Sequence, residues 1–206
     1  MEKVFNLNLK AQENIIIAEK EKFVAIELKK LAKNLLKKVK TRENFVEKEI
    51  KLAQVRMKLV ENNKELLENK IKSMELLKFP EAVIKNETDY IAYHEKVAKN
   101  QLELAKHHKE IAELEEKLAK KKFILANSKM HAANIRIKLG RYQLKYLTAI
   151  QKKSPKKALT LRESYKEEKR KLNHHMQDVI QNEKEVKLLQ KDIADITVKL
   201  SQTLVK

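Results

Sequence analysis

Apolar residues recur at every seventh position along most of this chain. In the first third, one column reads Ala11, Ala18, Ala25, Ala32, Val39, Val46, Ala53, Val60, Leu67 and Met74. The column beside it reads Val24, Leu31, Lys38, Phe45, Leu52, Leu59 and Leu66, and only Lys38 interrupts its apolar character. A seven-residue period is typical of helices that pack side by side in a left-handed coiled coil. These columns predict one long helix whose buried seam is formed by both of them.

A second pair of columns follows Pro80. One reads Tyr90, Val97, Leu104, Ile111, Leu118, Leu125, Ala132, Leu139 and Tyr146, and the other reads Ile91, Ala98, Ala105, Ala112, Ala119, Ala126, Ala133, Gly140 and Leu147. Small side chains let a neighbouring helix approach closely, so we expect Gly140 to mark a close contact rather than a loop. A third apolar column, Phe123, Met130, Ile137 and Leu144, predicts more than one neighbour for the second half of this helix.

A third helix is predicted after Pro155, with a column that reads Ala158, Tyr165, Leu172, Val179, Val186, Ile193 and Leu200. Before it, Ser154 is a favourable N-cap and Pro155 suits the first helical position, which predicts a reversal of the chain. At Pro80 the apolar columns change phase, which favours a reversal over the alternative, a kink in one longer rod. The helices are then expected at about 3–78, 81–153 and 156–204, the first two each roughly 110 Å long.

The fold class predicted from these patterns is all-α. We expect residues 1–206 to form a single elongated domain of three long helices in an antiparallel coiled-coil bundle. So thin a bundle exposes much apolar surface, which predicts a homodimer. We place the dimer contact at the unbroken run Ile15, Ile16 and Ile17, with Phe23 and Ile26 nearby.

Composition supports this interpretation and narrows the function. The 206 residues include one Gly, two Pro, no Cys and no Trp, so turns are few and neither disulfides nor thiolate chemistry is available. No apolar stretch reaches the length of a membrane span, and the first ten residues lack the order of a secretory signal. We therefore expect a cytoplasmic protein, located at a membrane surface or on the cytoskeleton.

The residues that build catalytic sites are scarce. None of the six histidines, His94, His107, His108, His131, His174 and His175, has the spacing of a helical zinc motif, and no glycine-rich phosphate loop is present. Slender coiled coils also rarely form sheltered pockets. We expect a non-enzymatic protein with no cofactor and no metal, and histidines that lie in solvent.

The formal net charge is +18, from 47 Lys and Arg against 29 Asp and Glu, and this excess attracts anionic surfaces. Lysine clusters are the candidate binding sites. They are Lys29, Lys30, Lys33, Lys37, Lys38, Lys40 and Arg42; Lys117, Lys120, Lys121 and Lys122; and Lys152, Lys153, Lys156 and Lys157, extended by Lys169, Arg170 and Lys171. The members of the first cluster are spread around the helix, so a merely solvated surface is its alternative interpretation.

Ser154, Pro155, Lys156 and Lys157 match a proline-directed phosphorylation site, and also basic tails that lie in the DNA minor groove. A helix cap followed by proline explains the same residues, and we favour that interpretation. Phosphorylation of Ser154 would remove up to about two charges from the basic turn.

Three long helices, few glycines, a basic charge and the KKSPKK turn together resemble the BAR-domain superfamily. That resemblance implies dimers that bind and curve anionic membranes through lysine-rich faces. The helical hairpins of the ESCRT-III and phage-shock type are a second, weaker resemblance. We therefore predict a dimeric scaffold that docks on an acidic membrane. The alternatives are a structural coiled coil on microtubules, other cytoskeleton or a larger assembly, and thirdly a nucleic-acid-binding protein.

Overall fold

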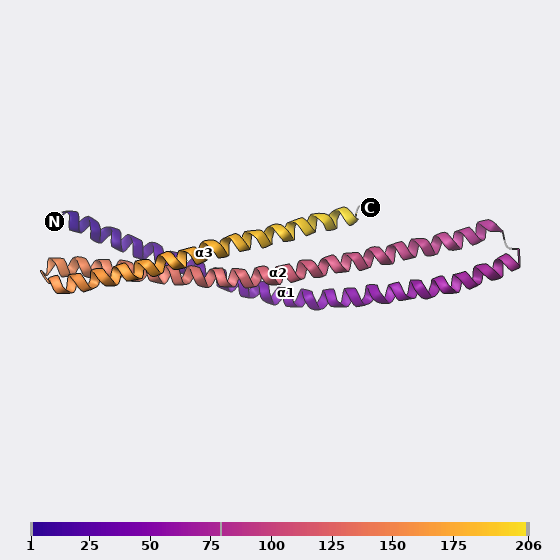
Figure 1. Cartoon of the computed structure of the whole chain (residues 1–206), viewed down its shortest axis with the longest axis horizontal. Coiled ribbons are helices and arrows are strands. Elements are labelled where there is room, and N and C mark those ends of the chain that lie inside the picture. The colour runs from indigo at the N-terminus through magenta and orange to yellow at the C-terminus, as the bar shows by residue number, and fades with distance from the viewer. Residues whose placement is uncertain (1, 79, 205–206) are drawn as a thin grey trace. The chain divides into compact units, whose positions relative to one another are not determined.

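The computed structural model describes the backbone of residues 2–78 and 80–204 and the side chains of residues 6–78 and 80–202. This part of the chain contains three helices, α1 (Glu2–Leu76), α2 (Glu81–Gln151) and α3 (Pro155–Leu204), and no strand (Figure 1). The prediction of an all-α fold with three long helices is confirmed. The helices begin and end within two residues of the predicted positions.

The turn between α2 and α3 is a Schellman motif. Lys153 has a positive φ of 51°, and its amide donates to the carbonyl of Ile150 at 3.0 Å. The amide of Ser154 donates to the carbonyl of Ala149, also at 3.0 Å. These bonds satisfy carbonyl groups that the end of a helix leaves without partners. The carbonyl of Ser154 then accepts the first bond of α3, from Ala158, so Ser154 is the N-cap as predicted.

A residue with a positive φ also follows the end of α1. Lys78 has a φ of 56°, and its amide donates to the carbonyl of Glu75 at 3.1 Å. Pro80 precedes α2, and its carbonyl accepts a bond from Val83 at 2.9 Å. The chain reverses between these helices, because rising residue numbers on α1 meet falling numbers on α2 in the pairs described below. The expectation of a reversal at Pro80 is therefore confirmed.

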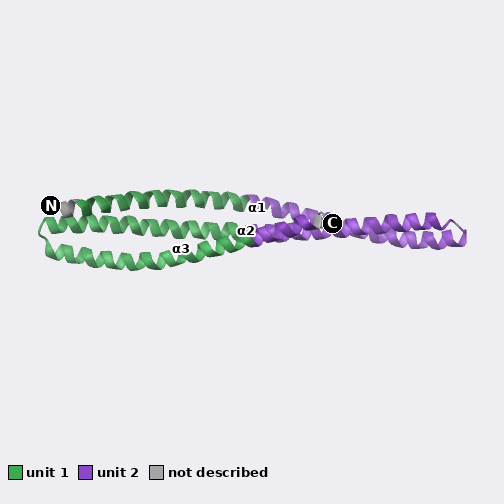
Figure 2. Ribbon diagram, turned by 90° about the horizontal axis from the view of Figure 1, so that it is seen from above, with its two compact units in different colours: residues 1–37, 116–191 green, residues 38–115, 192–206 purple. Residues whose placement is uncertain are grey.

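The helices form two compact units, which Figure 2 colours separately. Unit 1 consists of residues 1–37 and 116–191, and unit 2 of residues 38–115 and 192–206.

The core of unit 1 is built from small side chains on α1 and α2. Ala11, Ala18, Ala25 and Ala32 are at most 2% exposed, and they lie opposite the alanine column of α2. At Gly140 a Cβ atom would lie only 2.4 Å from Cγ1 of Ile15. The predicted close approach of two helices at Gly140 is confirmed.

In unit 1, α3 packs on α2 and gives it a second neighbour. Leu118, Leu125, Ala132 and Leu139 of α2 are buried, and α3 contributes Val179 and Val186. Polar pairs also join the two helices: Lys129 with Glu183 at 2.7 Å, and Asn182 with Ser128 at 3.4 Å. The second neighbour predicted for this half of α2 is therefore present, whereas Phe123 of the third apolar column lies beside Lys29 of α1.

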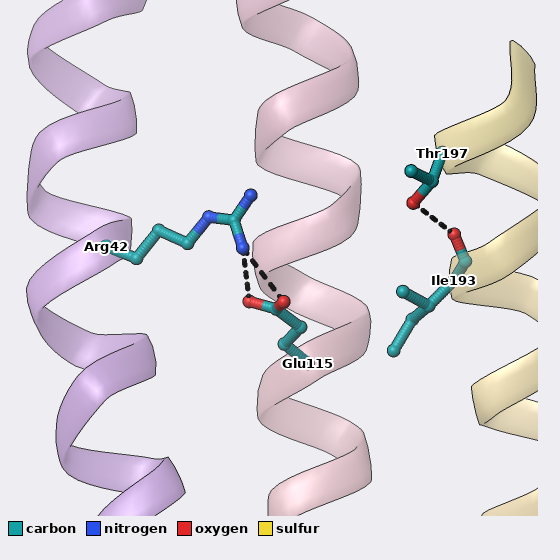
Figure 3. Close-up of polar contacts among 4 residues, drawn as sticks. All are labelled: Arg42, Glu115, Ile193 and Thr197. Atoms are coloured by element: carbon teal, nitrogen blue, oxygen red, sulfur yellow. Dashed lines mark hydrogen bonds and ion pairs between the residues drawn. The ribbon is translucent and has the colours of Figure 1, made fainter. Parts of the chain in front are cut away.

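In unit 2, α1 and α2 pair through Val39, Val46, Ala53 and Leu67 on one side and Ala98, Ala105 and Ala112 on the other, all of them buried. A ladder of polar pairs borders this seam. Its rungs are Arg42 with Glu115 at 2.8 and 2.9 Å (Figure 3), His108 with Glu49 at 3.1 Å, Arg56 with Gln101 at 2.6 Å, Lys64 with Glu95 at 3.5 Å, and Lys70 with Glu87 at 2.7 Å. Most rungs recur at multiples of seven residues, as expected for positions that flank a coiled-coil seam.

The prediction that the second column of α1 is buried is wrong. Val24 and Leu31 are 55% and 63% exposed in unit 1, and Phe45, Leu52, Leu59 and Leu66 are 55–67% exposed in unit 2. Neighbouring residues on a helix point about 100° apart. The first column shares the seam with the column four residues further on, in which Ile50, Met57 and Ile71 are half-buried. The second column is left on the flank of the helix pair.

Candidate anion-binding surface

The positive charge of the chain is concentrated in unit 1. Between residues 117 and 162 there are fourteen Lys and Arg and no Asp or Glu. They are Lys117, Lys120, Lys121, Lys122, Lys129, Arg136, Lys138, Arg141, Lys145, Lys152, Lys153, Lys156, Lys157 and Arg162. The predicted clusters missed six of these residues. The absence of any carboxylate over this length is the signal that could have found them.

The first part of this stretch is largely neutralised by carboxylates of other segments. Lys129 pairs with Glu183, Lys121 with Glu185, Arg136 with Glu21, and Lys120 with Glu116. All of these except the pair within α2 connect α2 to α1 or α3. These pairs lower the net charge that this part of the stretch presents to solvent.

The second part, residues 138–162, remains unneutralised. We call its eight cations the turn cluster: Lys138, Arg141, Lys145, Lys152, Lys153, Lys156, Lys157 and Arg162. All eight are exposed, and none forms an ion pair with another described residue, although Lys166 and, less strongly, Arg162 lower the pKa of Glu163. The spacing of three, four and seven residues on α2 places its members on one side of that helix. The turn cluster therefore combines one basic side of α2 with the exposed cations of the α2–α3 turn and the start of α3.

Helix electrostatics accounts for only some of these lysines. Lys152 and Lys153 lie at the C-terminal end of α2, where the partial negative charge of the helix favours cations. Lys156 and Lys157 lie in the first turn of α3, which contains no acidic residue. The partial positive charge of a helix N-terminus disfavours cations there. By this rule alone, Lys156 and Lys157 are unfavourable at the start of α3, although the end of α2 lies only a short turn away.

A tyrosine-lined cleft of about 320 Å³ lies beside the turn cluster. Its walls are Leu7, Tyr142, Gln143, Tyr146, Leu147, Leu161, Arg162 and Tyr165. The three tyrosines are half-buried, while Arg162 is exposed. A tyrosine combines an apolar ring with a polar hydroxyl, and this combination suits a boundary between apolar and aqueous surroundings.

The first predicted lysine cluster is partly occupied by internal contacts. In unit 1, Lys30 pairs with Glu27 at 2.7 Å, and the ammonium of Lys29 lies 5.0 Å from the ring centre of Phe123. Lys33 and Lys37 are exposed. In unit 2, Lys38 and Lys40 are exposed, whereas Arg42 is held by Glu115.

The remaining predicted residues divide in the same way. Lys117, Lys169 and Arg170 are exposed, and Lys122 is half-buried. Lys171 pairs with Glu167 at 2.9 Å and Glu168 at 3.4 Å, and the hydrogen bond to Glu167 is the main reason why the pKa of Lys171 is raised. Ser154 is half-buried at the N-cap of α3.

The histidines lie in different surroundings. His131 is exposed, and its ring lies 6.1 Å from that of His175, whereas His108 is a half-buried rung of the ladder. Among the described residues, no three His, Asp or Glu converge where they would hold a metal ion. None of the described helical segments has the length and apolar character needed to cross a membrane.

The chain shows no significant similarity to any protein-family model, curated protein or solved structure. The resemblance to the BAR-domain superfamily stays a prediction.

Proposed function

We propose that this protein is a non-enzymatic coiled-coil scaffold that docks on anionic membrane surfaces through the turn cluster. The observation that carries the proposal is the exposed, unneutralised charge of residues 138–162, where eight cations occur without one carboxylate. The opposition between Lys156, Lys157 and the N-terminus of α3 supports it, because a bound anion would remove that unfavourable interaction.

The charge is sufficient for reversible attachment. A Lys or Arg close to an anionic bilayer contributes about 1 kcal/mol, and this contribution falls off within a Debye length. If half of the turn cluster is engaged at once, the sum is about 4 kcal/mol, which corresponds to a dissociation constant near 1 mM for one chain. Attachment of this kind is sensitive to salt and is strengthened when several copies bind together.

The kinds of residue in the surface favour a membrane over nucleic acid. Six of the eight cations are lysines, which act as point charges, whereas bidentate recognition of phosphates and bases relies on arginine. The tyrosine-lined cleft beside the cluster also fits the level of lipid headgroups, where aromatic side chains with a polar end are enriched.

Co-sedimentation with liposomes tests the proposal. We expect the full chain to bind vesicles containing phosphatidylserine, to ignore neutral phosphatidylcholine vesicles, and to dissociate as salt is raised. The variant K152Q/K153Q/K156Q/K157Q should bind at least about tenfold more weakly. A matched control, K58Q/K72Q/K184Q/K187Q, removes four exposed lysines elsewhere and should retain most of the binding.

Binding that is indifferent to lipid charge, or weakened equally by both variants, would contradict this function. Sedimentation with microtubules but not with vesicles would favour the rival function of a structural coiled coil on an acidic filament. Tighter binding to single-stranded or duplex nucleic acid than to vesicles would favour the third alternative, a nucleic-acid-binding protein.

A further inference from the structure

A column of large apolar side chains is left uncovered in unit 2. Phe45, Leu52, Leu59 and Leu66 follow one another at seven-residue spacing on α1 and are 65%, 55%, 58% and 67% exposed. On the α2 side of the seam, Tyr90 is 62% exposed. Scattered apolar residues on a surface need no explanation, but a regular column of four does. Its period is that of a helix in a coiled coil, so its natural occupant is another helix.

The surface beside this column is hollowed. One cleft of about 190 Å³ is lined by Leu52 of the column together with Ala53, Leu104 and Ala105 of the seam. A second cleft of about 440 Å³ is lined by Leu59 and Leu66 of the column and by Tyr90 of α2. Side chains of the column form part of both walls. The face thus offers protruding side chains and holes side by side, as knobs-into-holes packing requires.

In unit 1 a third helix lies beside the corresponding face. Ile17 and Val24 occupy the same seven-residue column on α1 as Leu52, and Ala132 occupies the same column on α2 as Leu104. In unit 1 these residues share a cleft of about 490 Å³ with Met176, Val179 and Ile180 of α3. A helix therefore lies beside this kind of face within the chain itself, although Ile17 and Val24 stay 54% and 55% exposed.

The charges next to the column permit a second copy of this basic chain to approach. The neighbouring column on the outer side of α1 reads Thr41, Lys48, Val55, Asn62 and Asn69, and Lys48 is its only charged member. On the inner flank, Arg42, Glu49, Arg56 and Lys70 are each bonded to a partner on α2. A face rich in unpaired lysine would repel a copy of itself, whereas this face carries charges of both signs.

The exposed area is large enough for a specific dimer. Each of the large exposed side chains offers roughly 100 Å² of apolar surface. Together they amount to about 600 Å² in one copy and about 1,200 Å² in a pair, which is the lower limit for a stable interface. The six side chains are Phe45, Leu52, Val55, Leu59, Leu66 and Tyr90.

We infer that this face of unit 2, formed by the exposed column of α1 and the two adjoining clefts, is a homodimer interface occupied by the same face of a second copy. Each copy supplies both knobs and holes, as a two-fold interface demands. From the sequence alone we predicted the dimer contact at residues 15–17, but Ile15 packs against Gly140 of α2. Ile16, Ile17 and Phe23 are more than half exposed, so this part of α1 is the alternative site for a dimer contact.

Sedimentation equilibrium of the full chain tests the interface. We expect a mass near twice 24.2 kDa at micromolar concentration, and a dissociation constant at least about a hundredfold weaker for L52N/L59N. Leu188→Asn, at a position 60% exposed on α3, should dimerise like wild type. Circular dichroism should show equal helix content for all three, because the substituted leucines are exposed in a single chain.

The inferred dimer does not depend on membrane docking, and the two respond to salt in opposite directions. Added salt should tighten the dimer, since it screens the repulsion between two copies of charge +18, whereas it should weaken vesicle binding. A chain that stays monomeric throughout the micromolar range would overturn the inference. A dimer that survives L52N/L59N, or that is dissociated by I17N/F23N instead, would also overturn it.

Discussion

Exchanging Lys156 and Lys157 for glutamate is expected to stabilise the fold while weakening attachment to an anionic surface. Both lysines lie in the first turn of α3, which begins at Pro155 and has no acidic residue in that turn. A charge near a helix end changes stability by about 0.3–1 kcal/mol, with a sign set by the macrodipole. Two unfavourable interactions become favourable, so K156E/K157E should gain roughly 1–3 kcal/mol at low salt.

The same exchange removes two cations from the turn cluster and adds two anions. At about 1 kcal/mol for each cation near the bilayer, vesicle binding should lose about 2–4 kcal/mol, or roughly 30- to 1,000-fold in affinity. The suitable assays are urea unfolding followed by circular dichroism and vesicle co-sedimentation, both on the same protein at low ionic strength. The gain in stability should shrink as salt screens the helix end.

The double variant K187E/K191E is the matched control. It makes the same change in net charge at exposed positions in the interior of α3. Its stability should fall, because the new glutamates lie four residues from each other and from Glu183 and Asp195, and its binding should fall less than that of K156E/K157E. A K156E/K157E protein that unfolds more easily than wild type would refute the reasoning about the helix end. A stabilised protein that still binds vesicles normally would refute the role of the turn cluster.

Three further predictions concern single positions. Gly140→Ala should lower the free energy of unfolding by about 1 kcal/mol or more, because the new methyl group meets Ile15, and urea unfolding should show a smaller loss in an Ile15→Ala background. Lys153→Gly should raise the unfolding free energy by about 1 kcal/mol, since glycine adopts the positive φ without strain, whereas Lys153→Ala should be nearly neutral. The hydrogen bond from Lys121 lowers the pKa of Glu185 below its ordinary 4.5, so Glu185→Gln should be less stable than wild type above that pH. Acid titration should show this difference disappear as the pH falls through the lowered pKa, because both side chains are then uncharged.

Much of the fold could be predicted because helix formation and its boundaries depend on residues close together in the chain. The seven-residue columns located the three helices, and the Ser154-Pro155 pair located the start of α3. Gly140 could be assigned to a helix contact because it continues a column of alanines. The candidate site was only half predicted. The lysines of the KKSPKK turn stood out as a run, whereas Lys138, Arg141 and Lys145 are separated by apolar residues and form a surface only when wound on a helix.

By itself, therefore, the sequence determined the helices, their ends and the overall excess of positive charge. Only the tertiary structure decided which apolar column is buried and which cations are neutralised. Leu52 and Ala53 are adjacent members of equally regular columns, yet only Ala53 faces α2. Arg136 is neutralised by Glu21, which is remote in the sequence, while Arg141 has no ion-pair partner among the described residues. Periodicity shows which side chains share a face of a helix. Whether a side chain is buried, and whether its charge is neutralised, depends on what lies across that face in space.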